Sequence, residues 1–171
     1  MRFQKQAFRH QPELGIYGDC HRTVLACMLD MDRDDVPNFG KDYLDNAKFQ
    51  NEVNAWVHTQ GFQQTHFAFN VDLQKVFTML GSIFHNTYYI LGGNSKNGVG
   101  HSVICCADQI VWDTSLDDSG IVGPMDDDLY WVTILTPVRF TCKQDDLKEW
   151  LSKPEQKCEA GTDRGEVNAL V

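Results

Sequence analysis

The sequence predicts one α+β domain in which helices come first and an antiparallel sheet follows. In the first half of the chain, apolar residues recur at helical spacing between glycine and proline breaks. In the second half, short β-branched and aromatic runs alternate with turn residues, which is typical of strands. A chain of 171 residues is long enough for one well-packed domain and short for two. Helices and strands that are segregated along the chain are typical of the α+β class.

The chain begins with a lead-in, a helix and a turn. Residues 1–18 are mixed in character and predict an extended lead-in. Residues 20–30 are apolar on nearly every side, which indicates a helix buried in a core. Residues 32–39 are acidic and contain a proline, so we expect a short capped turn or a single helical turn there.

Two further helices are expected before the sheet. Apolar side chains recur at helical spacing over residues 41–60, and a glycine follows them. Residues 71–80 predict a short helix that ends at Gly81. Between these two helices, the phenylalanines of residues 62–69 fit a strand only loosely.

The second half of the chain predicts an antiparallel sheet. Its expected strands share a high content of β-branched and aromatic residues and span residues 87–91, 102–107, 110–112 and 129–135. The short connection at residues 107–109 predicts that residues 101–113 form an antiparallel hairpin. A loop rich in Ser, Asp and Gly follows over residues 114–124.

The end of the chain differs in composition from the rest. Residues 145–151 predict a terminal helix. Residues 152–171 are polar and aperiodic, and we expect them to be poorly ordered. The predicted organisation is therefore one domain over residues 1–151, followed by a polar tail.

Charge and hydropathy argue against two classes of partner. The net charge is −9 and no basic run is present, which argues against nucleic-acid binding. The longest uninterrupted apolar run, residues 24–29, is far too short to cross a bilayer. Because the amino-terminal residues also lack an apolar signal core, we expect a cytoplasmic protein with no membrane partner.

The six cysteines do not follow a disulfide or zinc pattern. The sequence contains no CxxC motif and no zinc-finger pairing of Cys with His. In a chain without an export signal, such cysteines are best interpreted as reduced thiols that pack as small apolar side chains. The acidic run at residues 126–128 lacks the glycine and distal glutamate of a calcium loop. We therefore expect neither a metal nor a cofactor.

Cys20 is the leading candidate for a reactive side chain. Gly18 allows a sharp turn, Asp19 can cap the helix that follows, and Cys20 then lies in the first helical turn. The partial positive charge at a helix start favours the thiolate, which is the nucleophilic form of cysteine.

His101 and Asp113 are the candidate partners of Cys20. A thiol nucleophile needs a base for its proton and a third group that orients the imidazole. His101 begins the first strand of the predicted hairpin and Asp113 ends the second, so the two are expected to be near cross-strand neighbours joined by a hydrogen bond. His101 is therefore the predicted base and Asp113 the predicted orienting residue.

The reaction also needs donors for the developing oxyanion. The backbone amide of Cys20, at the start of its helix, would supply one donor. A glutamine from the preceding segment is expected to supply the other, and Gln6, Gln4 and Gln11 are the candidates.

The other histidines are weaker candidates for the base. His21 is adjacent to Cys20 but is expected to point elsewhere, although it could line the cleft. The rest lack a neighbouring strand-end carboxylate: His10, His58, His66 and His85.

Several short motifs share their order and context with a known family. They include Gly18-Asp19-Cys20, Asp34-Asp35-Val36-Pro37-Asn38-Phe39, Gly100-His101-Ser102-Val103 and Val111-Trp112-Asp113. This order resembles the papain-like cysteine peptidases, and more closely the small papain-like proteins of tailed bacteriophages and bacteria. The resemblance covers about residues 5–125 and implies a papain-like fold. It implies Cys20 as nucleophile, His101 as base, Asp113 as orienting residue and a glutamine near Gln6 in the oxyanion hole.

Two substrate-facing loops depart from that family. Where the family usually carries His-Asp-Pro-His-Pro, this chain has Trp112-Asp113-Thr114-Ser115-Leu116. Residues 94–98 stand where the family often has Ser-Pro-Arg-Gly. The resemblance therefore does not imply a particular substrate.

The leading hypothesis is a thiol-dependent hydrolase, which could be a peptidase, an isopeptidase or an amidase. Its substrate would be a protein, a peptide or an amide-containing small molecule. A phage-encoded enzyme, as the resemblance implies, would act on a host component in the host cytoplasm. One alternative is a non-catalytic binding protein of papain-like fold that sequesters a host-defence protein or a small ligand. Another is an acyltransferase or transglutaminase-like enzyme in which an amine replaces water.

Overall fold

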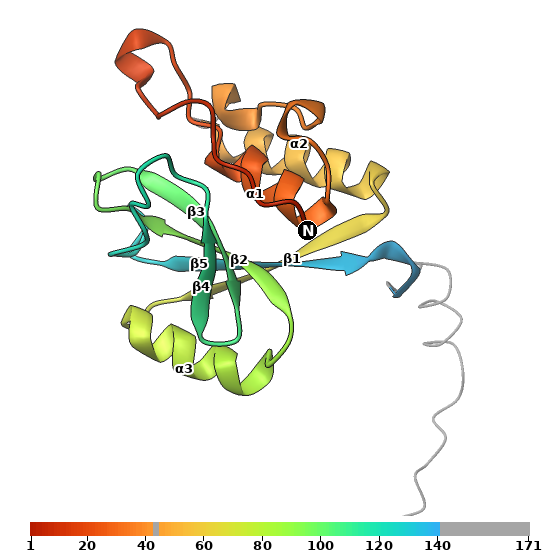
Figure 1. Cartoon of the computed structure of the whole chain (residues 1–171), viewed down its shortest axis with the longest axis vertical. Helices are drawn as coiled ribbons and strands as arrows, with labels where there is room; N and C mark the ends of the chain where they lie inside the picture. Colours follow the sequence, from red (N-terminus) through yellow and green to blue (C-terminus); the bar gives the residue numbers. More distant parts are fainter. Residues whose placement is uncertain (43–44, 141–171) are drawn as a thin grey trace, which may run out of the picture. The chain divides into compact units, whose positions relative to one another are not determined.

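A five-stranded antiparallel sheet runs through the centre of the structure in the strand order β1-β5-β2-β3-β4 (Figure 1). The computed structural model describes residues 1–42 and 45–140. Within them the strands are β1 (Phe62–Phe69), β2 (Tyr88–Asn94), β3 (Gly100–Cys106), β4 (Gln109–Asp113) and β5 (Tyr130–Pro137). The α-helices are α1 (Cys20–Leu29), α2 (Asn46–Thr59) and α3 (Leu73–Ile83). Short 3-10 turns are η1 (Pro12–Leu14), η2 (Arg33–Asp35), η3 (Phe39–Asp42) and η4 (Val138–Phe140). The predicted α+β class is confirmed.

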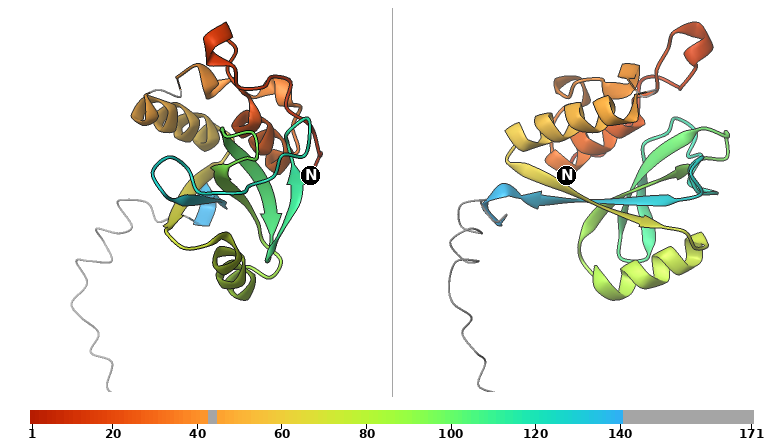
Figure 2. Two further views of the ribbon diagram at one scale, coloured as in Figure 1. Left: turned by 90° about the vertical axis from the view of Figure 1, so that its left-hand side faces the viewer. Right: turned by 180° about the vertical axis from the view of Figure 1, so that it is seen from behind.

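Helices cover both faces of this sheet (Figures 1 and 2). On one face, Leu25 of α1 and Val53 of α2 belong to the same core as Ile90 of β2. On the other face, Leu80 of α3 shares a second core with Leu91 of β2. Because consecutive residues of a strand point to opposite faces, the neighbours Ile90 and Leu91 enter different cores. The helices are therefore not confined to one face of the sheet, because α3 packs on the face opposite α1 and α2.

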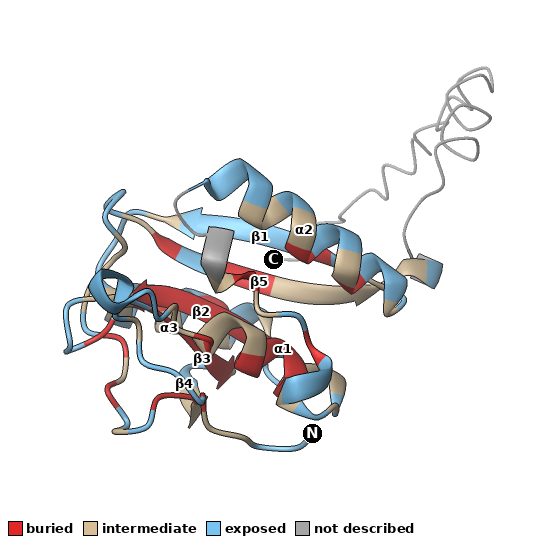
Figure 3. Cartoon of the chain, turned by 90° about the horizontal axis from the view of Figure 1, so that it is seen from above, coloured by how far each residue is buried: buried red, intermediate tan, exposed pale blue. Residues whose placement is uncertain are grey.

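α1 is a buried helix, as its composition predicts (Figure 3). Residues 24–27 have no exposed surface, and they form the centre of the core between α1, α2 and the sheet. The helix ends after Leu29 because Asp30 adopts a left-handed conformation with φ of 59°. The N–H of Asp30 then bonds to the carbonyl groups of Ala26 and Cys27, which closes the last turn.

α2 is shorter than the predicted helix over residues 41–60. Its first turn is capped by Asp45, whose carboxylate accepts a hydrogen bond from the N–H of Lys48 at 3.0 Å. A side-chain cap fixes the start of a helix, so α2 begins at Asn46, and residues 41–42 of the predicted helix belong to η3 instead. The end is as predicted, because Gly61 follows α2 with a φ of 82° that favours glycine.

β1 is a complete strand, although its sequence fits a strand only loosely. Its residues pair with β5 along the whole length, from Phe62 opposite Pro137 to Phe69 opposite Tyr130. β1 lies at the edge of the sheet and many of its side chains are exposed, so the usual apolar alternation is weak. Pairing with a strand that is distant in sequence, rather than local pattern, therefore determines this element.

α3 continues past the glycine that was expected to end it. The helix reaches Ile83, with Gly81 inside its last turn. A Cβ atom added at Gly81 would lie 2.9 Å from the Cβ of Asp108, in the turn between β3 and β4. Gly81 therefore allows close packing of α3 against that turn and does not act as a stop signal.

The predicted hairpin over residues 101–113 is confirmed. β3 and β4 pair antiparallel, and the turn between them places Ala107 at a φ of 53°. The pairing is irregular between Ile104 and Cys105, where a bulge shifts the register. This shift determines which β3 residue lies opposite the end of β4.

The predictions for the end of the chain fall outside the described residues. These are the helix over residues 145–151, the polar tail over residues 152–171 and the domain boundary between them. In the part of the chain that the structure describes, no helix is both long enough and apolar enough to cross a membrane.

Gln64 of β1 is a buried amide that lacks hydrogen bonds. Its side chain is 8 % exposed, and neither Oε1 nor Nε2 has a hydrogen-bond partner within the described structure. A buried polar group without a partner costs about 1–3 kcal/mol. We expect Gln64→Leu to raise the free energy of unfolding by about 1 kcal/mol, measured as a higher urea midpoint at unchanged slope. Gln63→Leu, at the exposed neighbour, should leave the midpoint nearly unchanged, and a lower midpoint for Gln64→Leu would contradict the prediction.

Candidate active site

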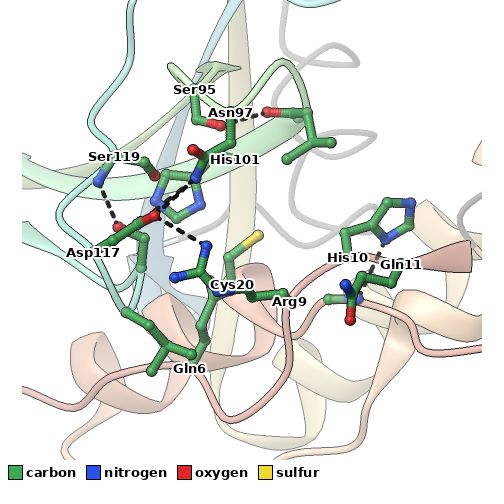
Figure 4. Close-up of a pocket in the computed structure, with 15 residues that line it drawn as sticks. Gln6, Arg9, His10, Gln11, Cys20, Ser95, Asn97, His101, Asp117 and Ser119 are labelled. Atoms are coloured by element: carbon green, nitrogen blue, oxygen red, sulfur yellow. Dashed lines mark hydrogen bonds and ion pairs between the residues drawn. The ribbon is translucent and has the colours of Figure 1, made fainter.

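The start of α1 and the adjoining ends of β3 and β4 meet at a small pocket (Figure 4). The pocket has a volume of about 160 Å³. Three of the four predicted site residues line it, namely Cys20, His101 and Gln6. The fourth, Asp113, lies directly behind His101, to which it is hydrogen-bonded.

Cys20 is the first residue of α1 and is half-buried. The start of this helix has no side-chain cap, because the carboxylate of Asp19 does not bond to the helical amides. The predicted capping role of Asp19 is therefore wrong. Its carboxylate accepts hydrogen bonds from the backbone N–H groups of Ala7 and Phe8 instead, at 3.0 and 2.9 Å. The uncapped amides leave the positive end of the helix directed toward the Cys20 position.

His101 is held by a buried carboxylate. Its Nε2 lies 2.7 Å from Oδ1 of Asp113, and His101 is only 4 % exposed. Asp113 pairs with Val103, so Asp113 and His101 are diagonal neighbours, in line with the expected near cross-strand position. Since residues two apart on a strand share a face, the Asp113 side chain still reaches the imidazole.

The Asp113 carboxylate has further donors on both oxygens. The backbone N–H of Ser115 bonds to Oδ1 at 2.7 Å, and the N–H of Gly120 bonds to Oδ2 at 2.7 Å. Burial opposes the charged form, but the hydrogen bonds from His101, Ser115 and Gly120 outweigh it and hold the pKa of Asp113 well below its usual range. Asp113 is therefore a fixed anion that orients the ring.

The pKa of His101 depends on both Asp113 and Cys20. Burial opposes its charging, but the bonded Asp113 carboxylate and the nearby Cys20 side chain outweigh burial and raise the pKa of His101 to about 9. Because Nε2 is bound to Asp113, Nδ1 is the ring nitrogen left for Cys20. Figure 4 shows the Cys20 and His101 side chains next to each other at the pocket wall. The imidazole is therefore mainly protonated at neutral pH.

Gln6 is the best placed of the three glutamine candidates. Its backbone N–H bonds to the carbonyl of Thr114 at 2.8 Å, and its Nε2 donates to the carbonyl of Phe8 at 3.0 Å. An amide NH₂ group has two hydrogens, so one donor of Gln6 remains for a ligand in the pocket. Gln4 is used elsewhere, since it bonds to the backbone of residues 31 and 33. Gln11 lines the pocket on the side of Cys20 away from Asp117 (Figure 4).

The amino-terminal segment packs against the end of β4, which sequence reasoning missed. Phe3 stacks on Trp112 with ring centroids 4.9 Å apart, and the indole N–H of Trp112 bonds to the carbonyl of Gln4 at 2.8 Å. The Lys5 ammonium donates to the carbonyl of Asp113 at 2.9 Å. These residues are more than a hundred positions apart in the chain, so no local pattern could signal the contacts.

An ion pair crosses the mouth of the pocket. Arg9 Nη1 lies 3.0 Å from Oδ2 of Asp117, and the amide of Asn97 donates to the same carboxylate at 3.2 Å (Figure 4). These three residues come from the amino-terminal segment and from the loops before β3 and after β4. Sequence reasoning did not single out Asp117, and only the tertiary structure places it at the site.

The remaining histidines do not act on Cys20, but one of them lines the pocket. His10 is a lining residue, and its Nδ1 accepts a hydrogen bond from the N–H of Gly18 at 3.2 Å. His21 does not line the pocket, contrary to one expectation. Its ring packs edge-on against Phe49, and its Nδ1 lies 3.4 Å from Oγ of Ser102.

The described cysteines are free thiols, namely Cys20, Cys27, Cys105 and Cys106. Burial raises the pKa of the Cys27 and Cys105 thiols, which lie in the two cores. Within residues 1–42 and 45–140, no three His, Cys, Asp or Glu side chains are grouped so that they could hold a metal ion. The chemistry that the described residues offer at this pocket is therefore that of a thiol beside a protonated imidazole.

Comparison with known proteins gives no match. No family model matches the chain, and no curated protein or solved structure is significantly similar to it. The arrangement of side chains around Cys20 is consequently the basis for assigning a function.

Proposed function

We propose that the protein is a thiol-dependent hydrolase that cleaves amide bonds with a papain-like Cys20–His101–Asp113 triad. The observation that carries the proposal is the position of His101 between the other two residues. Its Nε2 is bound to the buried Asp113 carboxylate, while the ring borders the same pocket as Cys20 at the start of α1. A cysteine nucleophile, an adjacent base and a third group that orients the base are the parts that such catalysis needs.

The reaction requires Cys20 as thiolate and His101 as imidazolium. The thiolate attacks the carbonyl carbon and forms a C–S bond, and the carbonyl electrons move to oxygen. When the C–N bond breaks, His101 gives its proton to the leaving amine. Neutral His101 then takes a proton from water, whose oxygen attacks the thioester. The acid leaves, and Cys20 again pairs with a protonated His101.

The negative oxygen of each tetrahedral intermediate needs hydrogen-bond donors. The backbone N–H of Cys20 has no side-chain cap competing for it, and the remaining N–H of Gln6 borders the same pocket. We assign the oxyanion hole to these two groups. Both are in place before substrate arrives, which is what makes such donors effective.

The substrate class is an amide of a protein, a peptide or a small molecule. Serine, asparagine and glutamine side chains line the pocket beside the Arg9–Asp117 pair. The pocket volume of about 160 Å³ favours a small group next to the scissile bond over a large side chain.

Selective alkylation of Cys20 tests the proposal. At pH about 6 an ordinary thiol is almost entirely protonated and reacts slowly with iodoacetamide. We expect Cys20 to be modified at least about tenfold faster than Cys106, the other half-buried described thiol, as measured by peptide mass spectrometry. The preference should disappear in His101→Ala. Equal rates for Cys20 and Cys106 in the wild-type protein would contradict an activated nucleophile and favour a binding protein of the same fold.

A second measurement separates a hydrolase from a transferase. Hydrolysis is followed with a panel of N-acetyl dipeptide aminomethylcoumarin amides, with and without added hydroxylamine or glycine amide. A hydrolase releases mainly the acid, whereas an acyltransferase transfers most of the acyl group to the amine. We expect mainly the acid, and predominant amine product at low amine concentration would assign the site to transfer.

A further inference from the structure

Asp19 is a buried charge that the triad does not use. It directly precedes Cys20, its side chain has no exposed surface, and its carboxylate makes no capping hydrogen bond to the helix that it precedes. Burying a carboxylate is costly unless its oxygens are hydrogen-bonded. The partners of Asp19 therefore indicate what the residue does.

Those partners lie on the segment that carries Gln6. Oδ1 of Asp19 accepts from the backbone N–H of Ala7 at 3.0 Å and from that of Phe8 at 2.9 Å, and Oδ2 lies 3.2 Å from the same Ala7 nitrogen. The carbonyl of Phe8 is in turn the acceptor for the Gln6 side chain, at 3.0 Å. Asp19 thus fixes the backbone to which the Gln6 amide is tied.

Arg33 supports the same segment from the other side of Gln6. Its Nε lies 3.7 Å from Oδ2 of Asp19, which compensates the buried charge. Its Nη1 donates to the carbonyl of Lys5 at 3.0 Å. The residues immediately before and after Gln6 are therefore anchored to one ion pair, in which Asp19 is buried and Arg33 is partly exposed.

We propose that Asp19 is a positioning residue that holds the Gln6 amide at the oxyanion site beside Cys20. This inference rests on the proposed hydrolase function. Asp19 acts through Gln6, since it bonds neither to His101 nor to Asp113 and does not line the pocket. Because Asp19 and Cys20 are consecutive, the position of the donor is coupled directly to the position of the nucleophile.

This arrangement predicts a specific kinetic defect when the carboxylate is lost. Oxyanion donors act in the transition state, so misplacing one lowers kcat and leaves KM nearly unchanged. Alkylation of Cys20 by iodoacetamide forms no oxyanion and should be nearly unaffected. A residue needed only for folding would not separate these two reactions.

The test compares Asp19→Asn, Gln6→Ala and the double variant on the coumarin amide that the wild-type protein cleaves fastest. Removing one oxyanion donor costs about 10²–10³ in kcat, and we expect this from Gln6→Ala. We expect Asp19→Asn to lower kcat at least about tenfold, with Cys20 alkylation close to wild type. The double variant should be no slower than Gln6→Ala, because both changes remove the same donor.

Thr23→Val is the matched control. Thr23 is fully buried and its hydroxyl bonds to the backbone carbonyl of Asp19 at 2.7 Å, so it perturbs the same site without touching the carboxylate. It should keep the wild-type ratio of hydrolysis to alkylation. If Asp19→Asn does not fold, it is replaced by Arg33→Gln, which changes a partly exposed side chain. Arg33→Gln should also lower kcat without slowing Cys20 alkylation, but by a smaller factor.

Three results would overturn the positioning role. The first is an unchanged kcat in Asp19→Asn, or in Arg33→Gln if that variant has to replace it. The second is a loss of Cys20 alkylation that parallels the loss of kcat. The third is that the effects of Asp19→Asn and Gln6→Ala on kcat are additive. Hydrolysis that persists in Cys20→Ala, or is absent from the wild-type protein, would instead overturn the proposed function and with it the positioning role.

Discussion

Asp113→Ala is expected to lower kcat/KM for amide hydrolysis by up to about 10⁴, the loss of kcat seen when the orienting aspartate of a catalytic triad is replaced. The Asp113 carboxylate fixes Nε2 of His101 at 2.7 Å, and the same carboxylate binds the N–H groups of Ser115 and Gly120. Alanine leaves the imidazole free to rotate away from Cys20 and leaves both amides without their acceptor. The residual rate is compared with that of Cys20→Ala, which gives the background without the nucleophile.

Asp113→Asn separates orientation from charge at the same position. Asparagine keeps an oxygen acceptor for the His101 ring but carries no charge, so a smaller loss of rate is expected. The raised pKa of His101, about 9, keeps the general acid protonated up to that pH, so wild-type hydrolysis should fall as pH rises through about 9. Removing the negative charge lowers the pKa of His101, and the alkaline limb should move to lower pH in Asp113→Asn.

Asp118→Ala is the control for these two variants. Its carboxylate is well exposed and pairs with Lys5 rather than with His101. We expect near-wild-type kcat/KM and an unchanged alkaline limb. Full activity of Asp113→Ala, in protein that unfolds at the normal temperature, would exclude a triad at this site.

The free energy of unfolding is expected to decrease by up to about 3 kcal/mol as pH falls from about 6.5 to 4, because of His21. Burial, together with the nearby His66, lowers the pKa of His21 to about 4. In the unfolded chain a histidine gains its proton near pH 6.5, so the unfolded state binds the proton first as pH falls. The contribution of neutral His21 is thus fully present above pH 6.5 and lost on the way to pH 4.

His21→Leu tests the acid sensitivity. The variant should lose much less stability than the wild-type protein between pH 7 and pH 4.5, as measured by urea unfolding at each pH. His58→Leu, at an exposed residue of α2, should keep the wild-type slope. Carboxylates whose pKa is held low, such as Asp113, lose their contribution only below about pH 5, where the unfolded chain begins to protonate them, so they affect the comparison down to pH 4.5 only slightly. An unchanged slope in His21→Leu would show that another group causes the acid sensitivity.

Sequence reasoning located the parts of the site that leave a local pattern. Cys20 stands between a glycine turn and an apolar helix, and His101 and Asp113 stand at the two ends of a short hairpin. Each of these three positions is indicated by residues in the same or the adjacent helix or strand. Local spacing was therefore sufficient to find them. The same holds for α1, whose apolar surface predicts its burial.

The parts that were missed depend on contacts between distant segments. Asp19 has the sequence signature of a helix cap, but its carboxylate bonds to Ala7 and Phe8, because those amides need a buried acceptor. β1 lacks apolar alternation and is determined by its pairing with β5. No periodicity in the sequence predicts the Asp19 hydrogen bonds or strand β1, because both depend on segments that meet only in the folded state.

The contact between the amino-terminal segment and the end of β4 has a consequence for the timing of folding. The hydrogen bond from Trp112 to Gln4 joins residues 108 positions apart, and the one from Lys5 to Asp113 spans the same separation. Contacts between distant residues carry the largest loop-closure cost and tend to form slowly. Gln6 and Asp113 are thus brought to Cys20 only after β4 has been made and docked. A chain still emerging from the ribosome would therefore carry the Cys20 thiol without the residues that complete its site. On refolding, the reactivity of Cys20 should be among the last native properties to return.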